Sequence, residues 1–393
     1  MKILFVSALY STPRRPGRGI GNARILHAMR RYADVRVMAP VPWYPPILRN
    51  HPSLAVDAGV PTSDLDDDGS TVLHPRILHL PRFGRSLYAG LYGASVLWPL
   101  VREVQRFRPD ALLSAWAYPD GTAVTALGSL LQIPTVVRVM GSDINSVAQL
   151  PGRREQIRWA MRRVERVIAV SRALANEVTA LGAHPDHVSI IPTGVDQTIF
   201  RPHERAEARR QIGAGDYPLV VVPARLSPEK GVHHFVDALA RLGPETPLRA
   251  VIVGDGQEKQ ALIAQAQRLG VADRIQFAGF QLEQRMPLYY SAADFICLPS
   301  LEEGWPDVLM EAFACGCPFV ASEVGGVPEI LELTGAGLLT PPGDVDALAR
   351  ALATATRTPW ERNAIAIAMQ AYDLNTTAQA YVAACAKAAG TRA

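Results

Sequence analysis

The sequence predicts an α/β fold built from two doubly wound, mostly parallel sheets. Three observations carry this prediction. The chain has 393 residues, which is more than one hydrophobic core usually organises. Short apolar runs alternate with helical stretches along its whole length, and near-continuous apolar runs are typical of strands that helices cover on both faces. Two parts of the chain also open alike, with a strand, a turn and the start of a helix, as doubly wound domains do.

The first series of strands lies in the N-terminal half. These expected strands are residues 3–9, 35–39, 111–115, 135–140 and 167–170. After the first strand, a turn rich in glycine, proline and arginine leads into a helix expected over residues 21–31. A strand that passes through such a turn into a helix N-terminus is suited to binding phosphate. We therefore expect a first Rossmann-like domain over residues 1–195.

The second series follows in the C-terminal half. These expected strands are residues 219–223, 250–253, 275–277, 295–299 and 319–321. A turn and two prolines between residues 192 and 202 interrupt the pattern, so the second Rossmann-like domain is expected over residues 196–373. The last helix, expected over residues 376–389, is apolar enough to pack back on the first domain, which would then include residues 374–393. The carboxyl ends of the two sheets would face each other across a cleft.

Composition and charge narrow the class of protein. Hydrophobic residues make up 48% and charged residues 20% of the chain, which excludes general disorder. No apolar stretch reaches the roughly 20 residues that span a bilayer, and the first residues lack a signal-peptide cleavage site. The four cysteines form no C-x-x-C pair, so we expect reduced thiols in a cytoplasmic protein that is soluble or peripheral on the inner face of the membrane. The net basic N-terminal half favours an anionic partner.

The most informative segment follows the strand expected at residues 295–299. A polar loop contains Glu303, and a helix is expected to begin near Pro306 with Glu311 inside it. Both carboxylates could then contact one ligand above the helix N-terminus, where free backbone N–H groups attract anions. A glycine turn at residues 325–329 could line the same cleft. The alternative is that Glu303 caps the helix and Glu311 is a solvated helix residue.

A second candidate site contains two cations. Arg225 follows an expected strand, and Lys230 lies at the start of the next helix. Only four of the 40 basic residues are lysines, so Lys230 does not simply reflect local composition. An arginine fork and a lysine ammonium at these places would bracket a diphosphate. The alternative is a pair of solvent-exposed cations.

In the first half, the segment Arg18-Gly19-Ile20-Gly21 connects a strand to a helix. Glycines let backbone N–H groups approach a phosphate closely. A single G-x-G is equally typical of an ordinary turn. The longer G-x-G-x-x-G spacing of dinucleotide-binding domains fails because Arg24 stands at the third glycine position, so we do not expect dehydrogenase chemistry.

Together these features resemble the retaining glycosyltransferases of family 4, which have the GT-B fold, over nearly the whole chain. The resemblance is carried by two carboxylates, two cations and a glycine turn, namely Glu303, Glu311, Arg225, Lys230 and residues 325–329. In the first half, residues 18–21, 116–121 and 141–145 look like the branch that makes teichuronic-acid-type and other envelope polysaccharides.

The resemblance implies an activity. The chain would move a hexose-type sugar from a UDP- or GDP-sugar to a glycan or lipid-linked acceptor in cell-envelope or exopolysaccharide biosynthesis. The anomeric configuration would be retained, and no metal or other cofactor would be required. Arg225, Lys230 and the backbone of residues 19–21 would hold the donor diphosphate.

The resemblance also implies how the rest of the donor binds. Glu311 would accept hydrogen bonds from the ribose hydroxyls. Glu303 and the backbone from Gly304 to Pro306 would hold the transferred sugar.

Two aromatic residues and one departure complete the expected site. Phe280 and Trp305 would line the pocket that selects the base and the sugar. Many family members carry histidine where this chain has Met140, so Asp143 or a backbone group would take its place near the sugar.

Other motifs in the chain are interpreted structurally. Residues 64–68 contain a literal D-x-D, the metal signature of another transferase fold, but no buried strand precedes it. We interpret this segment as a solvated loop and expect no metal site. Ser300 and Cys315 lie near the expected site, but neither has a histidine placed to activate it as a nucleophile.

Four arginines recur every four residues and predict one basic stripe on a helix. They are Arg154, Arg158, Arg162 and Arg166. This stripe is interpreted either as a plain surface face or as a contact with anionic lipid, helped by Tyr88, Tyr92 and Trp98 as interfacial aromatics. No recognition motif for nucleic acid accompanies it, so nucleic acid is not an expected partner.

Two other functions remain open on the same fold. A nucleotide-sugar epimerase would work without an acceptor and would need acid–base groups around the sugar, which the sequence does not assign. A non-catalytic nucleotide-sugar-binding subunit is favoured by Met140 at the usual histidine position. Release of nucleoside diphosphate that depends on an acceptor distinguishes the transferase from both.

Overall fold

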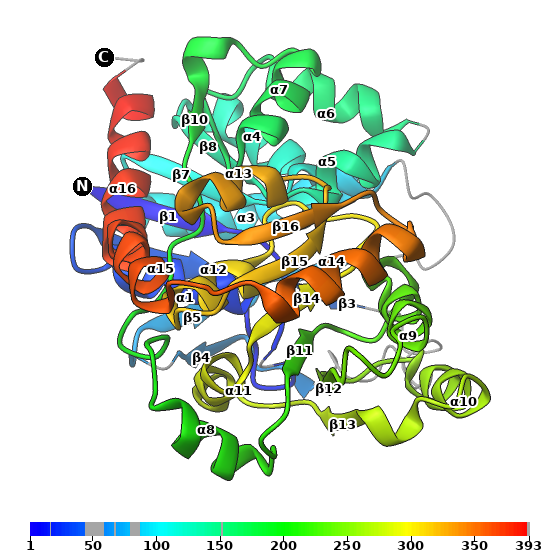
Figure 1. The fold of residues 1–393 in the computed structure, drawn as a ribbon. Helices are drawn as coiled ribbons and strands as arrows, with labels where there is room; N and C mark the ends of the chain where they lie inside the picture. Colours follow the sequence, from blue (N-terminus) through cyan, green and yellow to red (C-terminus); the bar gives the residue numbers. More distant parts are fainter. Residues whose placement is uncertain (16, 44–58, 67, 79–86, 151, 391–393) are drawn as a thin grey trace. The chain divides into compact units, whose positions relative to one another are not determined.

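The chain divides into two compact units (Figure 1). The computed structural model describes residues 1–15, 17–43, 59–66, 68–78, 87–150 and 152–390. Unit 1 consists of Met1–Pro192 together with Asn375–Ala393, and unit 2 consists of Thr193–Leu374. Each unit contains a mostly or entirely parallel sheet whose strands alternate with helices along the chain, so the predicted α/β class is confirmed.

An eight-stranded sheet forms the centre of unit 1, in the order β10-β9-β8-β7-β1-β2-β5-β4. Its strands are β1 (Lys2–Val6), β2 (Asp34–Met38), β4 (Ser63–Leu65), β5 (Thr71–Leu73), β7 (Ala111–Ala115), β8 (Thr135–Val139), β9 (Arg166–Ala169) and β10 (Val188–Ile190). Neighbouring strands run parallel except β4 and β5, which pair antiparallel. All residues of β7 and β8 are buried, as expected for strands covered on both faces. The strand order reverses between β1 and β7, which pair directly.

Helices connect the strands of unit 1, and a separate two-stranded sheet joins β3 (Val41–Trp43) to β6 (Arg76–Leu78). The helices are α1 (Ile20–Met29), α3 (Tyr88–Phe107), α4 (Thr122–Leu131), α5 (Ser142–Asn145), α6 (Arg153–Met161), α7 (Arg172–Ala180) and α16 (Leu374–Gly390). α16 packs in unit 1 although it comes from the far end of the chain. Thr377 Oγ1 donates to the Pro192 carbonyl at 3.4 Å, and the Arg138 guanidinium lies 5.7 Å from the centre of the Tyr381 ring.

Unit 2 contains a six-stranded parallel sheet in the order β13-β12-β11-β14-β15-β16. Its strands are β11 (Leu219–Pro223), β12 (Arg249–Val253), β13 (Ile275–Gly279), β14 (Phe295–Leu298), β15 (Phe319–Ser322) and β16 (Gly337–Thr340). Counted within the unit, this order is 3-2-1-4-5-6, which is that of the Rossmann fold. The order reverses between β11 and β14. In open α/β sheets, ligands bind outside the carboxyl ends of the strands at this switch point.

Eight α-helices accompany the strands of unit 2, all of whose residues the structure describes. They are α8 (Arg205–Ile212), α9 (Val232–Ala240), α10 (Lys259–Arg268), α11 (Met286–Ala292), α12 (Asp307–Ala314), α13 (Val327–Thr334), α14 (Val345–Arg357) and α15 (Arg362–Ala368). One core cluster joins the apolar faces of α9, α10 and α14 to β11, β12 and β14. Leu239, Leu352 and Ile252 in this cluster are fully buried.

The ten predicted strands are all present, and the expected helices at residues 21–31 and 376–389 correspond to α1 and α16. The prediction missed β10 and β16, and also the four short strands β3 to β6. β10 contains a central serine and is partly exposed, and β16 begins with glycine, so neither has a continuous apolar run of the kind used to predict strands.

The interpretation of residues 64–68 as a solvated loop is wrong for residues 64–66 and 68, and Asp67 lies outside the described residues. Asp64 belongs to β4 and lies 2.9 Å from His74 Nε2, and Asp66 accepts hydrogen bonds from Arg30 at 2.8 Å and from Tyr10 at 3.0 Å. The carboxylates are therefore used for pairing within unit 1. Among the described residues, no group of three or more histidines, cysteines, aspartates or glutamates is placed to hold a metal ion.

The single basic stripe predicted from four arginines is also wrong. α6 ends at Met161, because the chain then turns to enter β9, and Arg166 is the first residue of that strand. Arg166 Nη1 donates to the Asp186 carbonyl and to Ser189 Oγ. Tyr92, expected at a lipid interface, is fully buried. No helix in the described part of the chain has the length and apolar character needed to cross a membrane.

Candidate active site

The candidate site of unit 2 lies at its switch point. Arg225 comes two residues after β11 ends, and the loop that begins at Pro299 follows β14. β11 and β14 are hydrogen-bonded neighbours, with Val220 opposite Phe295. Because both strands run in the same direction, their carboxyl ends bring the two predicted parts of the site to one edge of the sheet.

Lys230 and Glu303 form an ion pair in this place. Lys230 Nζ donates to Glu303 Oε1 at 2.7 Å, and Ser300 Oγ donates to the same oxygen at 2.7 Å. The Glu303 side chain is only 8% exposed and that of Lys230 is 24% exposed, so water screens this pair less than a surface pair. The structure thus joins the residue predicted to bind the diphosphate to the one predicted to bind the sugar.

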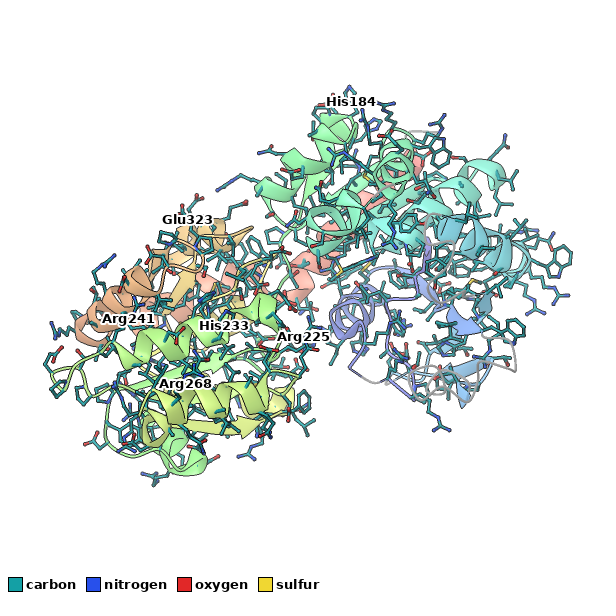
Figure 2. The ribbon with its side chains drawn as sticks, turned by 90° about the vertical axis from the view of Figure 1, so that its right-hand side faces the viewer. His184, Arg225, His233, Arg241, Arg268 and Glu323 are labelled. Atoms are coloured by element: carbon teal, nitrogen blue, oxygen red, sulfur yellow. The ribbon has the colours of Figure 1, made fainter. Side chains whose placement is uncertain are left out.

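Arg225 is oriented by a neighbour that sequence reasoning did not assign. Arg225 Nη2 donates to Glu229 Oε1 at 2.6 Å, and Ser227 Oγ donates to the same oxygen at 2.6 Å. The Ser227 hydrogen bond, together with Arg225, lowers the pKa of Glu229 to about 2. The Arg225 side chain is 70% exposed, so the guanidinium remains open to a ligand. Figure 2 shows Arg225 well apart from Arg241 and Arg268 of the same unit.

The loop before α12 offers free hydrogen-bond donors. Among the described residues, the backbone N–H groups of Gly304 and Trp305 and the buried indole Nε1 of Trp305 have no acceptor. Trp305 is 8% exposed, and a buried N–H without a partner costs free energy. The predicted glycine turn packs directly on this loop. Gly326 N donates to the Gly304 carbonyl at 2.9 Å, and a Cβ on Gly325 would lie 2.0 Å from the Glu303 carbonyl oxygen.

Glu311 lies in α12 and is not simply solvated. Tyr290 of α11 donates its hydroxyl to Glu311 Oε2 at 3.0 Å. Tyr290 is fully buried, and its burial and the neighbouring Glu311 charge raise the pKa of its hydroxyl. The tyrosine therefore stays a donor and fixes the carboxylate at its place in the helix. Phe280 is 73% exposed and follows β13, two strands away from β11.

The discounted nucleophiles have structural partners. Ser300 donates its hydroxyl to Glu303, as described above. Cys315 is 1% exposed, and burial raises the pKa of its thiol well above the usual range. The other three cysteines are also buried and free.

In unit 1, Asp143 braces two loops. It is fully buried; Oδ1 accepts from the backbone N–H groups of Met140 at 3.0 Å and Gly141 at 2.9 Å, and Oδ2 accepts from Ala117 N at 2.8 Å. The loops after β7 and β8 are thereby tied together. This geometry favours a positioning role for Asp143 over the predicted catalytic role, because both oxygens already accept backbone hydrogen bonds.

Gly19 and Gly21 lie at the start of α1. Gly19 precedes the helix with φ 65°, and a Cβ there would lie 2.4 Å from the Leu9 carbonyl oxygen. Asn22 Nδ2 donates to the same carbonyl at 2.7 Å. The glycine thus lets the helix start pack against the loop after β1. The close approach is thus made to the chain itself, and the expected contact of this turn with a donor diphosphate stays a prediction.

Two family models match the chain and together span most of it. Residues 22–198 match the model described as Glycosyltransferase Family 4, and residues 204–370 match Glycosyl transferases group 1. The chain belongs to the family 4 glycosyltransferases. The chain is 28% identical over 369 residues, 90% of its own length and 88% of the relative's, to the Bacillus subtilis protein TuaC, whose name assigns it to teichuronic acid biosynthesis as a glycosyltransferase. The predicted resemblance to this branch is therefore confirmed.

Solved glycosyltransferase structures share the GT-B fold. Anabaena HepE in complex with UDP has a TM-score of 0.71 at 24% identity, with 98% of this chain and 99% of that one covered. Sucrose-phosphate synthase from Thermosynechococcus elongatus has a TM-score of 0.75 at 19% identity, with 98% of each chain covered. At these identities the likeness establishes the fold. Within it, both site-bearing loops of this glycosyltransferase follow the strands at the unit 2 switch point.

Proposed function

We propose that this glycosyltransferase moves a hexose from a UDP- or GDP-sugar to a glycan or lipid-linked acceptor of the cell envelope. It retains the anomeric configuration and needs no metal ion. The observation that carries the proposal is the grouping of Lys230, Arg225 and three free N–H groups at the switch point of unit 2. HepE, a protein of the same fold, has been crystallised with UDP-glucose.

The two cations suit a diphosphate. Arg225 presents a fork of donors and Lys230 a compact charge, and both follow β11 on one turn. The free N–H groups of Gly304 and Trp305 add neutral donors for phosphate or sugar oxygens. When a bound diphosphate takes over Lys230, Glu303 loses its ammonium partner and can accept hydrogen bonds from sugar hydroxyls. Glu311, held by Tyr290, is placed to accept bonds from the ribose.

The same groups lower the barrier to transfer. As the bond between the anomeric carbon and the phosphate oxygen breaks, negative charge grows on the leaving diphosphate and positive charge on the sugar. Preorganised donors aimed at the growing charge stabilise the transition state, and one such donor contributes about 3–4 kcal/mol. Lys230 and Arg225 supply the positive charge that a divalent ion supplies elsewhere. The acceptor hydroxyl attacks from the face that the diphosphate leaves, and its proton passes to the leaving phosphate.

Acceptor-dependent release of nucleoside diphosphate tests this proposal. The purified full chain is incubated with UDP- and GDP-hexoses, with and without oligosaccharide or prenyl-linked sugar acceptors, in buffer containing EDTA. We expect release that depends on an acceptor and a product with retained configuration. Conversion of the donor into its epimer without acceptor would show an epimerase, and binding without turnover would show a non-catalytic subunit. Activity abolished by EDTA and restored by a divalent ion would contradict the metal-free mechanism.

A further inference from the structure

Unit 1 contains a pocket at its own switch point. The pocket has a volume of about 240 Å³, and its walls include Ala8 after β1, Arg18 before α1, Tyr88 and Tyr92 of α3, and Trp116 and Asp120 after β7. All of these residues belong to unit 1. The volume lies below the roughly 300–1,000 Å³ of pockets that take drug-sized ligands, so it suits a single ring.

Asp120 leaves one carboxylate oxygen free in this pocket. The residue is 4% exposed, and its Oδ1 accepts from Ser7 Oγ at 2.9 Å, from Tyr92 Oη at 3.2 Å and from the Ala8 backbone N–H. Among the described residues, Oδ2 has no donor. Asp120 lines the pocket, so this oxygen is available to accept a hydrogen bond from a hydroxyl of a bound molecule.

Arg18 places a positively charged hydrogen-bond donor in the wall of the same pocket. Its guanidinium makes no hydrogen bond or ion pair with the described residues, and its side chain is half-buried. Burial raises the pKa of Asp120, and the nearby Arg18 charge opposes this rise. The pocket wall therefore carries a fork of free donors and a free acceptor, and their formal charges cancel. Such a pair suits the hydroxyl groups of a neutral ring better than an anionic group, which Asp120 would repel.

Aromatic rings complete the wall. Trp116 has φ 79° and ψ 116°, a backbone conformation that is rare outside glycine and is concentrated at functional sites. Trp116 N donates to the Arg138 carbonyl at 2.9 Å, and its own carbonyl accepts from Gly121 N at 2.8 Å, so the strained residue is held in place. Together with Tyr88, it offers apolar surface against which the C–H face of a sugar ring can pack.

We propose that this pocket binds one neutral hexose ring of the acceptor, with Arg18 and Asp120 hydrogen-bonded to its hydroxyls. The proposal rests on the glycosyltransferase function, because it assigns the occupant to the acceptor. It names Arg18, Asp120 and Trp116 as residues that select the acceptor sugar. Neutral hexosides are therefore preferred to uronides of the same ring size.

Direct binding tests the proposal independently of turnover. Ligand-observed NMR measures the affinity of the full chain for methyl glucoside, galactoside and mannoside and for methyl glucuronide. Arg18→Gln removes the charged fork from a half-buried position. Asp120→Asn keeps an oxygen for the three buried donors and turns the free acceptor into a donor. Arg14→Gln, an exposed arginine of the same loop that does not line the pocket, is the matched control.

We expect one or more methyl hexosides to bind the wild type and the Arg14→Gln variant alike. Both pocket variants weaken that binding about tenfold or more, with unchanged affinity for UDP or GDP. Preferred binding of the uronide, binding equal in Arg18→Gln and wild type, or no hexoside binding at all would overturn the proposal. If Arg18→Gln transfers sugar with an unchanged acceptor KM, the pocket proposal is wrong and the proposed function stands. If hexosides bind but no acceptor-dependent turnover is found, the proposed function is wrong instead. Arg18→Gln decides the matter if Asp120→Asn fails to fold.

Discussion

The two switch points have the same topology and opposite chemistry. In unit 2, between β11 and β14, the charged groups already meet in pairs, Lys230 with Glu303 and Arg225 with Glu229. In unit 1, between β1 and β7, the space is hollow and its two charged groups, Arg18 and Asp120, form no ion pair with each other. Paired, preorganised charge is suited to an anion that must be held while its charge grows. A hollow with separate donors and acceptors is suited to a neutral molecule with many hydroxyls.

The largest effect is expected at the unit 2 switch point. Lys230→Ala lowers kcat by a hundredfold or more, because it removes a charge aimed at the leaving diphosphate. The variant also removes the cation that pairs with Glu303, whose side chain is only 8% exposed in the structure. Steady-state kinetics with the best donor and acceptor measure this change. The charge-matched control is Lys387→Ala on the exposed face of α16, for which kcat stays within twofold of wild type. Equal kcat values for the two variants would remove Lys230 from the site.

The next effect lies in unit 1 and concerns stability. Asp143→Ala leaves three backbone N–H groups without their acceptor and lowers the free energy of unfolding by about 2 kcal/mol, or about 4–8 °C in Tm. Thermal unfolding measures the loss. Asp143→Asn keeps one side-chain oxygen that can accept hydrogen bonds from part of these N–H groups, so its free energy of unfolding should fall less than that of Asp143→Ala. A large fall in kcat at unchanged Tm in Asp143→Asn would restore the catalytic role that the sequence favoured.

Arg225 should matter less than Lys230, because its side chain is 70% exposed against 24% for Lys230. We expect Arg225→Ala to lower kcat/KM about tenfold, which corresponds to about 1.4 kcal/mol. Glu229→Gln, which weakens the hold on Arg225, should lower it only a few-fold. Arg268→Ala, at an exposed position of unit 2, is the control and leaves kcat/KM unchanged. If Glu229→Gln were as damaging as Arg225→Ala, Glu229 itself would contact the donor.

The smallest effect is a difference in pH dependence between the units. The pKa of Glu229 is lowered to about 2, so its contribution to stability is full above the ordinary value near 4.5 and is lost as pH falls toward 2. Its side chain is 40% exposed, so this contribution is small. The pKa of Asp120 is raised by burial, so its folded form holds a proton longer, and stability falls as pH rises above the ordinary value near 4.

Urea unfolding of variants between about pH 3.5 and about pH 8, a range that begins below the ordinary carboxyl pKa values and extends well above them, measures these slopes. Relative to wild type, Glu229→Gln loses stability as pH rises from about 3.5 toward about 4.5. Asp120→Asn instead gains stability relative to wild type as pH rises above about 4. Slopes of the same sign in the two variants would contradict the assignment of opposite environments to the two carboxylates.

Most helices and strands of this fold could be predicted, because the pattern of apolar residues within each segment indicates its secondary structure. Apolar runs such as residues 219–223 are buried strands in any α/β sheet, and the structure has β11 at those residues. The pair Glu303 and Glu311 and the cations Arg225 and Lys230 follow strands or begin helices, so their places were also predictable. The strand β4 was missed because its three residues, Ser-Asp-Leu, contain no apolar run. The end of α6 was missed because β9, which begins at Arg166, is fixed by pairing with β8 about 30 residues earlier in the chain.

The partners of site residues could not be predicted. Nothing in the spacing of Lys230 and Glu303, 73 residues apart, shows that they share an ion pair. Asp120 lies in a segment that the resemblance singled out, but its free oxygen depends on Ser7, Ala8 and Tyr92 occupying the other one. Glu229 could have been found, since it stands four residues after Arg225 in a turn, a spacing at which opposite charges often meet.

The most direct test of the central claim is a crystal structure of the full chain with its nucleotide sugar or nucleoside diphosphate. We predict that Lys230 Nζ and the Arg225 guanidinium lie within about 3 Å of diphosphate oxygens, with Lys230 released from Glu303. We also predict a ligand acceptor on Trp305 Nε1 or on the backbone N–H groups beside it. A diphosphate bound elsewhere, with the Lys230–Glu303 pair intact, would show that these groups do not bind the donor.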